Sequence, residues 1–235
     1  MEEYALEESL LNIRPDKILG SFLKRRPVAK REYDQFLATP ETVSRRTGLL
    51  NFLGDVRGKK ILFLGDDDFT SVAVAGLNLA HQVTVLDIDQ RILETIGQIS
   101  TEKELEIKTM AGDVRKPLPP EVIKGFDVVF TDPPYTPEGV SLFLSRGIEA
   151  LDPENLAARI YFCYGNSDRA KERFLPIYES IFKNGLMVRY VFDKFNRYVG
   201  AESIGSASSL FVTEVTSKTK AGISGKYDKP IYTNN

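Results

Sequence analysis

The sequence predicts an α/β protein built on a Rossmann-like sheet, with a short helical extension at its N-terminus. From about residue 59 onward, apolar runs of strand length alternate with helical stretches, and several runs end in glycine or aspartate. Such alternation is typical of a mostly parallel sheet covered by helices on both faces. With 235 residues, 42% of them hydrophobic, the chain can bury a substantial core in one main domain.

Each element is expected at a definite place. Helices are predicted over residues 2–11 and about 14–38, and another over about 39–53, where Thr39 caps the first turn and Pro40 occupies it. The predicted strands are 61–65, 83–89, 105–109, the start of 126–135, 159–165, 186–192 and about 208–216, and the helices between them are 69–80, 90–103, 138–150 and 168–183. We divide the chain into a helical lead-in (1–55), a Rossmann-like catalytic domain (56–216) and a loosely held polar tail (217–235).

Composition excludes several classes of protein. No apolar run approaches the roughly 20 residues that span a bilayer, and the acidic N-terminus does not resemble a secretory signal. We therefore expect a cytoplasmic protein that contacts no membrane. Cys163 is the only cysteine and lies in a predicted strand, so neither a disulfide nor a cysteine nucleophile is expected. His81 is the only histidine, which argues against a histidine-based triad or metal site.

The net charge of −2 conceals an uneven distribution. Residues 61–155 contain 7 Lys+Arg against 17 Asp+Glu, whereas residues 1–60 have 12 against 9 and residues 156–235 have 12 against 7. Such an acidic segment favours a cationic ligand, while nucleic-acid binders usually carry a basic footprint. The basic cluster 24–31 could contact a nucleic acid, although a solvated helix face is the expected interpretation.

Three consecutive acids follow the first predicted strand. Gly65 lets the backbone turn sharply there and approach a ligand closely, and Asp66, Asp67 and Asp68 occupy the turn itself. The dinucleotide fingerprint GxGxxG is absent, and a diphosphate beside three carboxylates would be repelled. An NAD site is therefore excluded.

The next two strands also end in acids. Asp87, with Asp89 two residues later, can accept hydrogen bonds from both ribose hydroxyls of a nucleoside. Asp113, which follows Gly112 after the third strand, can accept from an adenine amino group. A lone acid at a strand end is often only a turn or cap residue, but acids after three successive strands together describe a nucleoside cleft.

The fourth strand runs into the turn Asp132-Pro133-Pro134-Tyr135. The prolines rigidify this turn, so that it presents backbone carbonyls and the Asp132 carboxylate as acceptors. A nucleophilic amine needs such acceptors to orient its N–H bonds and to take up positive charge as nitrogen attacks. Tyr135 could close over a sulfonium or ammonium group by a cation–π contact.

These motifs resemble those of a known family. The turn 132–135 is similar to the amine-site motif of class I N-methyltransferases, and the combination of 65–71 with 132–136 resembles, more narrowly, the branched-chain polyamine synthases. The stretches 33–46, 85–89, 115–119 and 195–199 are similar to the same family, so the resemblance covers roughly residues 33–216. Longer members have an additional N-terminal domain.

The resemblance implies an aminopropyltransferase that moves the aminopropyl group of decarboxylated S-adenosylmethionine to the central nitrogen of spermidine. A second transfer would give N(4)-bis(aminopropyl)spermidine, with methylthioadenosine as the coproduct of each. The charge pattern agrees, because Asp66, Asp67 and Asp68 would repel the carboxylate of intact S-adenosylmethionine and attract the terminal ammonium of the decarboxylated form.

Roles follow from this resemblance. Gly65, Asp66, Asp67, Asp87, Asp89 and Asp113 are expected to hold the nucleoside and its tail. Asp68, Asp132 and Tyr135 would form the transfer site, with Asp68 and Asp132 orienting and deprotonating the amine. Pro133, Pro134, Asp193 and Glu202 would contact the polyamine. We expect a homodimer with no metal and no tightly bound cofactor, since the sulfonium is already a good leaving group.

Alternatives remain open at this point. An S-adenosylmethionine-dependent N-methyltransferase acting on nucleic acid or protein would share the same motifs. A catalytically silent nucleoside-sensing or RNA-associated module would draw its support from the basic cluster 24–31. Asp68 could also serve only as the cap of the following helix.

Overall fold

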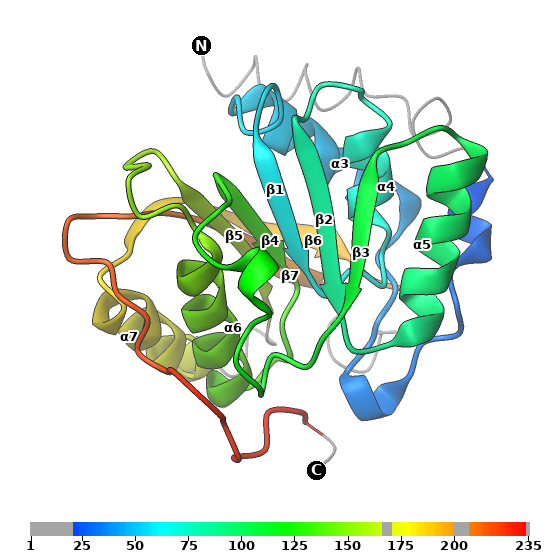
Figure 1. Ribbon diagram of the computed structural model, residues 1–235. Coiled ribbons are helices and arrows are strands. Elements are labelled where there is room, and N and C mark those ends of the chain that lie inside the picture. The colour runs from blue at the N-terminus through cyan, green and yellow to red at the C-terminus, as the bar shows by residue number, and fades with distance from the viewer. Residues whose placement is uncertain (1–20, 166–170, 200–206, 234–235) are drawn as a thin grey trace.

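A seven-stranded sheet organises the chain in a computed structural model that describes residues 21–165, 171–199 and 207–233 (Figure 1). The strand order is β3-β2-β1-β4-β5-β7-β6, and β7 alone runs antiparallel to its neighbours. The strands are β1 (Lys60–Leu64), β2 (Gln82–Asp87), β3 (Ile107–Ala111), β4 (Val128–Thr131), β5 (Arg159–Tyr164), β6 (Met187–Arg197) and β7 (Ala207–Glu214). This arrangement confirms the predicted Rossmann-like sheet of the class I methyltransferase type.

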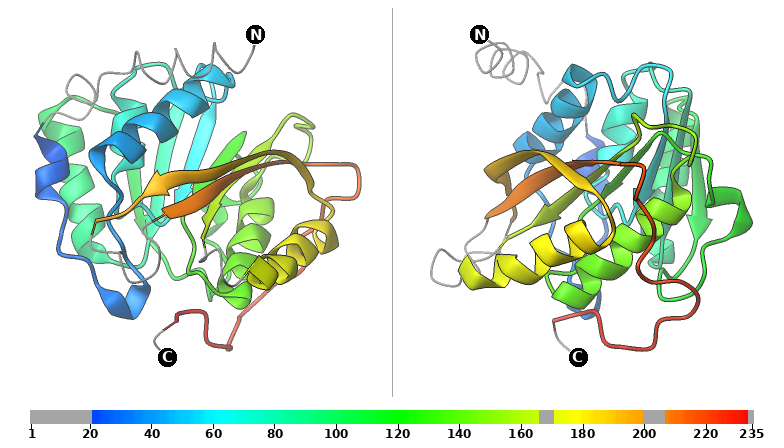
Figure 2. Two further views of the ribbon diagram at one scale, coloured as in Figure 1. Left: turned by 180° about the vertical axis from the view of Figure 1, so that it is seen from behind. Right: turned by 90° about the vertical axis from the view of Figure 1, so that its left-hand side faces the viewer.

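Helices cover both faces of the sheet (Figures 1 and 2). One face packs against α3 (Pro40–Phe52), α4 (Thr70–Ala75) and α5 (Gln90–Glu102), and the other against α6 (Pro137–Ala150) and α7 (Leu175–Lys183). None of the helices in the described part of the chain has both the length and the apolar character needed to cross a bilayer.

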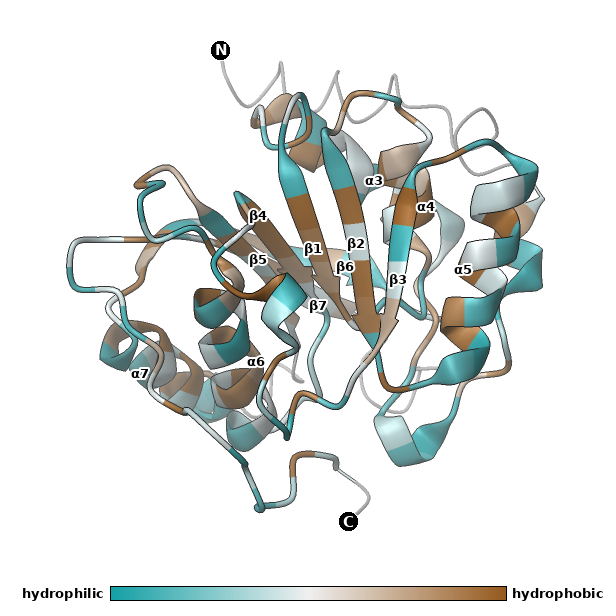
Figure 3. Ribbon diagram, in the orientation of Figure 1, coloured by the Kyte–Doolittle hydropathy of each residue, from teal (hydrophilic) through white to brown (hydrophobic). Residues whose placement is uncertain are grey.

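Successive side chains of the central strand β1 pack into two hydrophobic cores, one on each face of the sheet. On β1, Ile61 and Phe63 belong to the core under α3, α4 and α5, whereas Leu62 and Leu64 belong to the core under α6 and α7. All four are fully buried, because a central parallel strand has a helical layer on each side. The hydropathy view shows the same apolar centre in β1, β2 and β4 (Figure 3).

The predicted long helix over 14–38 is wrong for residues 21–38. This segment contains only two short 3-10 helices, Phe22–Arg25 and Arg31–Tyr33, joined by extended chain. Pro27 lies between them and cannot donate the backbone N–H that a continuous helix needs. The predicted helix over 2–11 and the first part of 14–38 lie outside the described residues.

The helix after the first strand is also shorter than predicted. It covers Thr70–Ala75 instead of 69–80, and Phe69 in front of it has a left-handed backbone, with φ of 61°. In the opposite direction, β6 extends to Arg197, well past the predicted end at 192, because its last residues pair with the start of β7.

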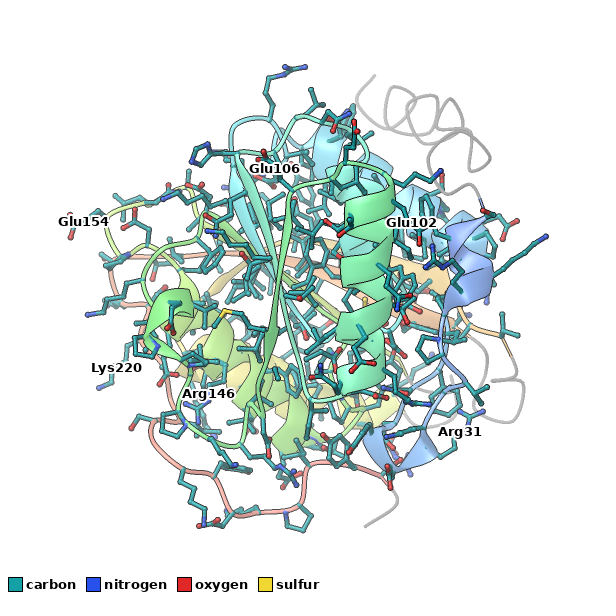
Figure 4. The ribbon with its side chains drawn as sticks, turned by 45° about the vertical axis from the view of Figure 1, so that its right-hand side comes forward. Arg31, Glu102, Glu106, Arg146, Glu154 and Lys220 are labelled. Atoms are coloured by element: carbon teal, nitrogen blue, oxygen red, sulfur yellow. The ribbon has the colours of Figure 1, made fainter. Side chains whose placement is uncertain are left out.

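The polar tail is held firmly, contrary to the expectation of a loose extension. Arg146 on α6 is fully buried and donates hydrogen bonds to the carbonyls of Val114 and Gly225 (Figure 4). Further along, the Ile231 side chain is buried and its carbonyl accepts a hydrogen bond from the Thr136 hydroxyl at 2.7 Å. The tail therefore runs as a strap across α6 toward the edge where the parallel strands end (Figure 1).

Candidate active site

The acids predicted at the strand ends lie at one edge of the sheet. Asp66, Asp67 and Asp68 follow β1, Asp87 ends β2, and the turn beginning at Asp132 follows β4. Because β1, β2, β3 and β4 run parallel, their carboxyl ends share this edge. The three-acid turn opens at Gly65, whose φ of +74° is a conformation that favours glycine.

Asp66 and Asp87 brace the backbone of this edge. The two oxygens of Asp66 accept hydrogen bonds from the N–H groups of Thr70 and Ser71 at 2.9 and 3.0 Å, so this carboxylate caps α4. Asp87 accepts from the N–H groups of Asp66 and Asp89 at 2.9 and 2.8 Å. Burial raises the pKa of Asp66 to about 8 and that of Asp87 to about 6.

Arg46 joins the β1 turn to the β4 turn. It projects from α3, and its side chain is only 1% exposed. Its Nη1 lies 2.6 Å from Asp68 Oδ2, and its Nη2 lies 2.6 Å from Asp132 Oδ2. Nε donates to Asn196 Oδ1 at 2.8 Å, and Nη2 also donates to the Tyr198 hydroxyl at 3.1 Å. One guanidinium thus fixes the spacing of two carboxylates.

Asp68 has contacts suited to positioning. Besides Arg46, it accepts a hydrogen bond from the backbone N–H of Ala38 and lies 3.7 Å from Nη1 of Arg26. Burial raises its pKa while Arg46 opposes that shift. The alternative in which Asp68 caps the following helix is wrong, because Asp66 fills that position. The proton-accepting role predicted for Asp68 stays a prediction, and its contacts favour a positioning role instead.

Two tyrosines complete the surroundings of Asp132. Tyr198, just after β6, donates to Asp132 Oδ2 at 2.6 Å. Tyr135 donates to Asp132 Oδ1 at 3.1 Å, and the two phenolic oxygens are 2.8 Å apart. Burial raises the pKa of both tyrosines well above the ordinary value, so they remain protonated donors at neutral pH. Asp132 is therefore held on both of its oxygens.

Asp67 differs from its neighbours. Within the described ranges, its carboxylate has neither a hydrogen bond nor an ion pair, and the residue is half-buried. Burial, together with the charges of Asp68, Asp132, Asp87 and Asp66, raises its pKa well above the ordinary value. This carboxylate is the one of the three-acid turn left available to a cationic ligand.

The acid cluster predicts that stability falls as pH rises. Each carboxyl with a raised pKa keeps its proton in the folded state at pH values where the unfolded chain has released it, so stability decreases from about pH 4 up to the folded pKa. For Asp87, a change from 3.8 to about 6 corresponds to about 3 kcal/mol at most. The carboxyls with lowered pKa values, such as Asp89 and Asp113, are already ionised above pH 5 and do not oppose this trend.

We therefore expect the melting temperature of the free protein to decrease between pH 5 and pH 8 by several degrees. Asp67→Asn removes one group from the cluster and should flatten the slope, while Asp152→Asn, in the loop before β5, should leave it unchanged. Calorimetry at four pH values measures both effects. A melting temperature that stays constant or rises over this range would contradict the assignment of raised pKa values.

The two remaining acids that were predicted to hold a nucleoside are ion-paired. Asp89 caps α5 through the N–H of Arg91 and pairs with the Arg91 guanidinium at 2.5 Å. Asp113 pairs with Arg115 at 2.9 Å. Hydrogen bonds from Arg91 lower the pKa of Asp89, and hydrogen bonds from Arg115 lower that of Asp113 against the effect of burial. Both carboxylates are therefore negative acceptors at neutral pH.

Of the residues predicted to contact the polyamine, two lie beside Asp132. Pro133 and Pro134 are buried beside Asp132. Asp193 is exposed on β6 and accepts a hydrogen bond from Ser209 at 3.0 Å instead of joining the acids of the strand ends. Glu202 lies outside the described residues.

Sequence reasoning missed Arg46, Asn196 and Tyr198. The stretches 33–46 and 195–199, which carry the family resemblance, contain all three. Their roles become visible only when α3 and the end of β6 are brought beside β4. The resemblance of these stretches was the available signal.

The single cysteine and the single histidine lie in surroundings that indicate no catalytic or metal-binding role. Cys163 is fully buried with its sulfur 3.4 Å from Arg46 Nη2, and burial raises the pKa of its thiol, which does not suit a nucleophile. His81 is exposed in the loop before β2. In the residues that the structure describes, no group of three or more His, Cys, Asp or Glu is placed to hold a metal ion.

The basic cluster 24–31 does not form the predicted helix face. Arg25 pairs with Glu102 at the end of α5 at 2.6 Å (Figure 4), and Arg26 donates to the carbonyl of Ala38 at 2.7 Å. Lys30 lies 3.9 Å from Asp89. These cations dock the lead-in against the domain, which weakens the argument for an RNA-associated module.

Comparison with known proteins gives a consistent family. A family model described as the C-terminal domain of branched-chain polyamine synthase A matches residues 17–230. An uncharacterised protein of Methanocaldococcus jannaschii is 43% identical over 195 residues, which cover 83% of this chain and 48% of that protein. N(4)-bis(aminopropyl)spermidine synthase of the same organism is 36% identical over 181 residues, covering 75% of this chain and 51% of the relative.

A solved structure shares the whole architecture. The branched-chain polyamine synthase from Thermus thermophilus, in complex with N4-aminopropylspermidine and 5′-methylthioadenosine, superimposes with a TM-score of 0.84 and 25% identity. The match covers 98% of this chain and 73% of that one. The chain spans about half the length of the curated relatives it matches.

Proposed function

The chain belongs to the branched-chain polyamine synthase family, and from this premise we propose that it is an aminopropyltransferase. Decarboxylated S-adenosylmethionine is the donor, and the central nitrogen of spermidine is the acceptor. Two transfers give N(4)-bis(aminopropyl)spermidine. As part of the same proposal we assign a homodimer as the working assembly and require no tightly bound cofactor.

The reaction itself is a nucleophilic displacement at carbon. The lone pair of the central nitrogen attacks the aminopropyl carbon bonded to sulfur, the carbon–sulfur bond breaks, and its electron pair remains on sulfur. The sulfonium thereby becomes the neutral thioether of 5′-methylthioadenosine. The first transfer converts a secondary amine into a tertiary amine and releases a proton. The second gives a quaternary ammonium, so its nitrogen loses a proton only before the attack.

The nucleoside occupies the ends of β1, β2 and β3 in this proposal. Gly65 brings the backbone close to the ligand, Asp87 accepts from the ribose hydroxyls and Asp113 from the adenine amino group. Asp66 and Asp89 support this site mainly through the turns and helices they cap.

The amine binds at the end of β4. In the first transfer, Asp132 and the carbonyls of Pro133 and Pro134 orient the single N–H of the attacking secondary amine, and Tyr135 lies beside it. In the second transfer, Asp132 accepts the proton that the tertiary amine loses before its attack. Asp132 is locked by Arg46, Tyr198 and Tyr135, so it is an acceptor in a fixed position, which is what alignment of the lone pair requires. Asp193 and Glu202 remain proposals for contacts to the distal amines.

The single observation that carries this function is the unpaired Asp67 carboxylate within the acid cluster. Burial and the charges of Asp68 and Asp132 raise its pKa, so its ionisation is linked both to its own turn and to the turn after β4. A terminal ammonium or a polyamine nitrogen placed there would lower the pKa of Asp67 and form a charge pair with its carboxylate, worth about 4 kcal/mol at a surface-like dielectric before desolvation and the release of the Asp67 proton are subtracted. The carboxylate of intact S-adenosylmethionine would instead meet repulsion.

Product analysis tests the proposal directly. After incubation with spermidine and decarboxylated S-adenosylmethionine, mass spectrometry should detect products heavier by one and by two aminopropyl groups, together with 5′-methylthioadenosine. Intact S-adenosylmethionine in a parallel incubation should give neither these products nor methylated spermidine. Methyl transfer from the intact form, with no aminopropyl product, would favour the N-methyltransferase alternative and overturn the proposal.

A further inference from the structure

The lead-in and the tail of the chain meet beyond the ends of the strands (Figure 2). The backbone N–H and the hydroxyl of Thr233 donate to the two carboxylate oxygens of Asp34 at 2.8 and 2.6 Å. The preceding residues on each side, Tyr33 and Tyr232, place their ring centroids 5.8 Å apart. Two segments separated by almost the whole sequence thus present one aromatic pair.

This aromatic pair lies against the acids assigned to the nucleoside. The guanidinium of Arg115, which holds Asp113, is 5.8 Å from the centroid of the Tyr232 ring. On the other side, Lys30 lies 5.1 Å from the centroid of the Tyr33 ring and 3.9 Å from Asp89. Burial raises the pKa of Tyr232 to about 12, and the charges of Asp113 and Asp87 add to this shift, as expected for a ring close to both acids.

The strap also touches the amine side of the site. The Ile231 carbonyl accepts a hydrogen bond from the hydroxyl of Thr136, which caps α6 directly after the turn 132–135. Ile231 itself is buried, so the ring of Tyr232 follows an anchored residue. The position of this ring is therefore fixed relative to both β3 and β4.

The geometry of the pair restricts how a base could bind. The ring planes are inclined by 46°, and a base held between two parallel rings would need centroids about 7 Å apart, twice the van der Waals contact distance. The rings are too close and too tilted for that. They can form one wall, against which a flat base stacks on one side only.

We propose that Tyr232 and Tyr33 form the aromatic wall of the adenine subsite, so that the C-terminal strap is part of the donor site. The proposal deepens the proposed function and depends on it, since the ligand is the nucleoside of the donor. Aromatic rings bind bases through their π-faces with little dependence on hydrogen bonding, which complements the acceptor role of Asp113. Without the strap, one side of the base would face solvent.

A tryptophan reporter tests the wall, because the chain contains no tryptophan. In Tyr232→Trp, titration with 5′-methylthioadenosine should change the fluorescence of the new indole and saturate, and spermidine alone should have no such effect. Tyr190→Trp is the matched control, since Tyr190 is exposed on β6 at the opposite edge of the sheet from β3 and should not respond.

Calorimetry with the same nucleoside supplies the energetic test. Tyr232→Ala should weaken the binding of 5′-methylthioadenosine roughly 5- to 150-fold, the range expected for losing one aromatic stack, and Tyr232→Phe should remain within about twofold of wild type. If the wild-type protein does not bind the nucleoside at all, the proposed function fails. If the wild type binds while Tyr232→Ala binds equally well and the reporter is silent, this inference alone is overturned.

Discussion

Asp132→Asn should lower the turnover of aminopropyl transfer about 100-fold or more, with the dissociation constant of 5′-methylthioadenosine within about twofold of wild type. The substitution keeps the shape of the side chain and removes its charge. The new side-chain amide would also bring N–H donors to a position where Arg46 Nη2 and the Tyr198 hydroxyl already donate. The amine loses its charged acceptor, whereas the nucleoside acids at β2 and β3 are untouched.

Single-turnover and steady-state measurements with spermidine check this result. Asp152→Asn is the control for the chemical change itself, because Asp152 lies in the loop that precedes β5, at the other end of the sheet. Its turnover should remain within about twofold of wild type. A normal turnover in Asp132→Asn would remove this carboxylate from the mechanism, and a large loss of nucleoside affinity would show instead that it serves the donor.

The gathering of the strand-end acids at one edge of the sheet could be predicted from the sequence, because parallel strands place their carboxyl ends together. Gly65, Asp87 and Asp132 each follow an apolar run of strand length, Asp113 follows the short predicted strand 105–109, and the structure places the ends of β1 to β4 at one edge. Neither the order of the strands nor the antiparallel β7 is needed for this conclusion. The residues that follow each strand can be recognised from the neighbouring sequence alone.

The different contacts that the three consecutive acids make could not be predicted from the sequence. Asp66 turns back to cap α4, Asp68 faces Arg46, and Asp67 remains unpaired within the described ranges. These directions depend on backbone angles, among them the positive φ of Gly65 and of Phe69. Sequence alone gives three equivalent carboxylates, whereas the fold gives a cap, an ion-pair partner and a free acceptor.

The partners of Asp132 could not be predicted for another reason, which is that they lie far from it in the sequence. Arg46 precedes Asp132 by 86 residues and Tyr198 follows it by 66. An arginine on a predicted helix normally indicates a solvent-facing position, and only burial against two carboxylates makes it part of a site. Similarly, the tail is polar in composition, yet Arg146 and Asp34 bind its backbone.

The second large effect is expected at Arg46. Arg46→Met removes the guanidinium and leaves the Asp68 and Asp132 carboxylates close together in a buried site. Breaking a buried ion pair in this way costs about 3–5 kcal/mol, which corresponds to a decrease in melting temperature of about 6 to 20 °C for a domain of this size. Turnover should fall about 100-fold or more, because Asp132 loses the contact that fixes its position.

The variant Arg46→Lys tests whether the positive charge of Arg46 is sufficient or whether the shape of its guanidinium is also required. It keeps one positive charge but cannot bridge both carboxylates while also donating to Asn196, as the planar guanidinium does. We expect a turnover about 10- to 100-fold below wild type and a smaller loss of stability than in Arg46→Met. Arg45→Met is the matched control, since Arg45 on the same helix packs over the Phe195 ring and should have little effect on turnover.

A double variant distinguishes positioning from simple stabilisation. Arg46→Met with Asp68→Asn removes the buried charge that the first substitution leaves uncompensated, so the melting temperature should recover part of its loss. Turnover should not recover, because nothing then holds Asp132 at the end of β4 as the guanidinium does. If turnover returned together with the melting temperature, Arg46 would contribute only to stability. If the pH–rate profile of Arg46→Lys also matched that of the wild type, Arg46 would have no role in setting the charge of the acid cluster.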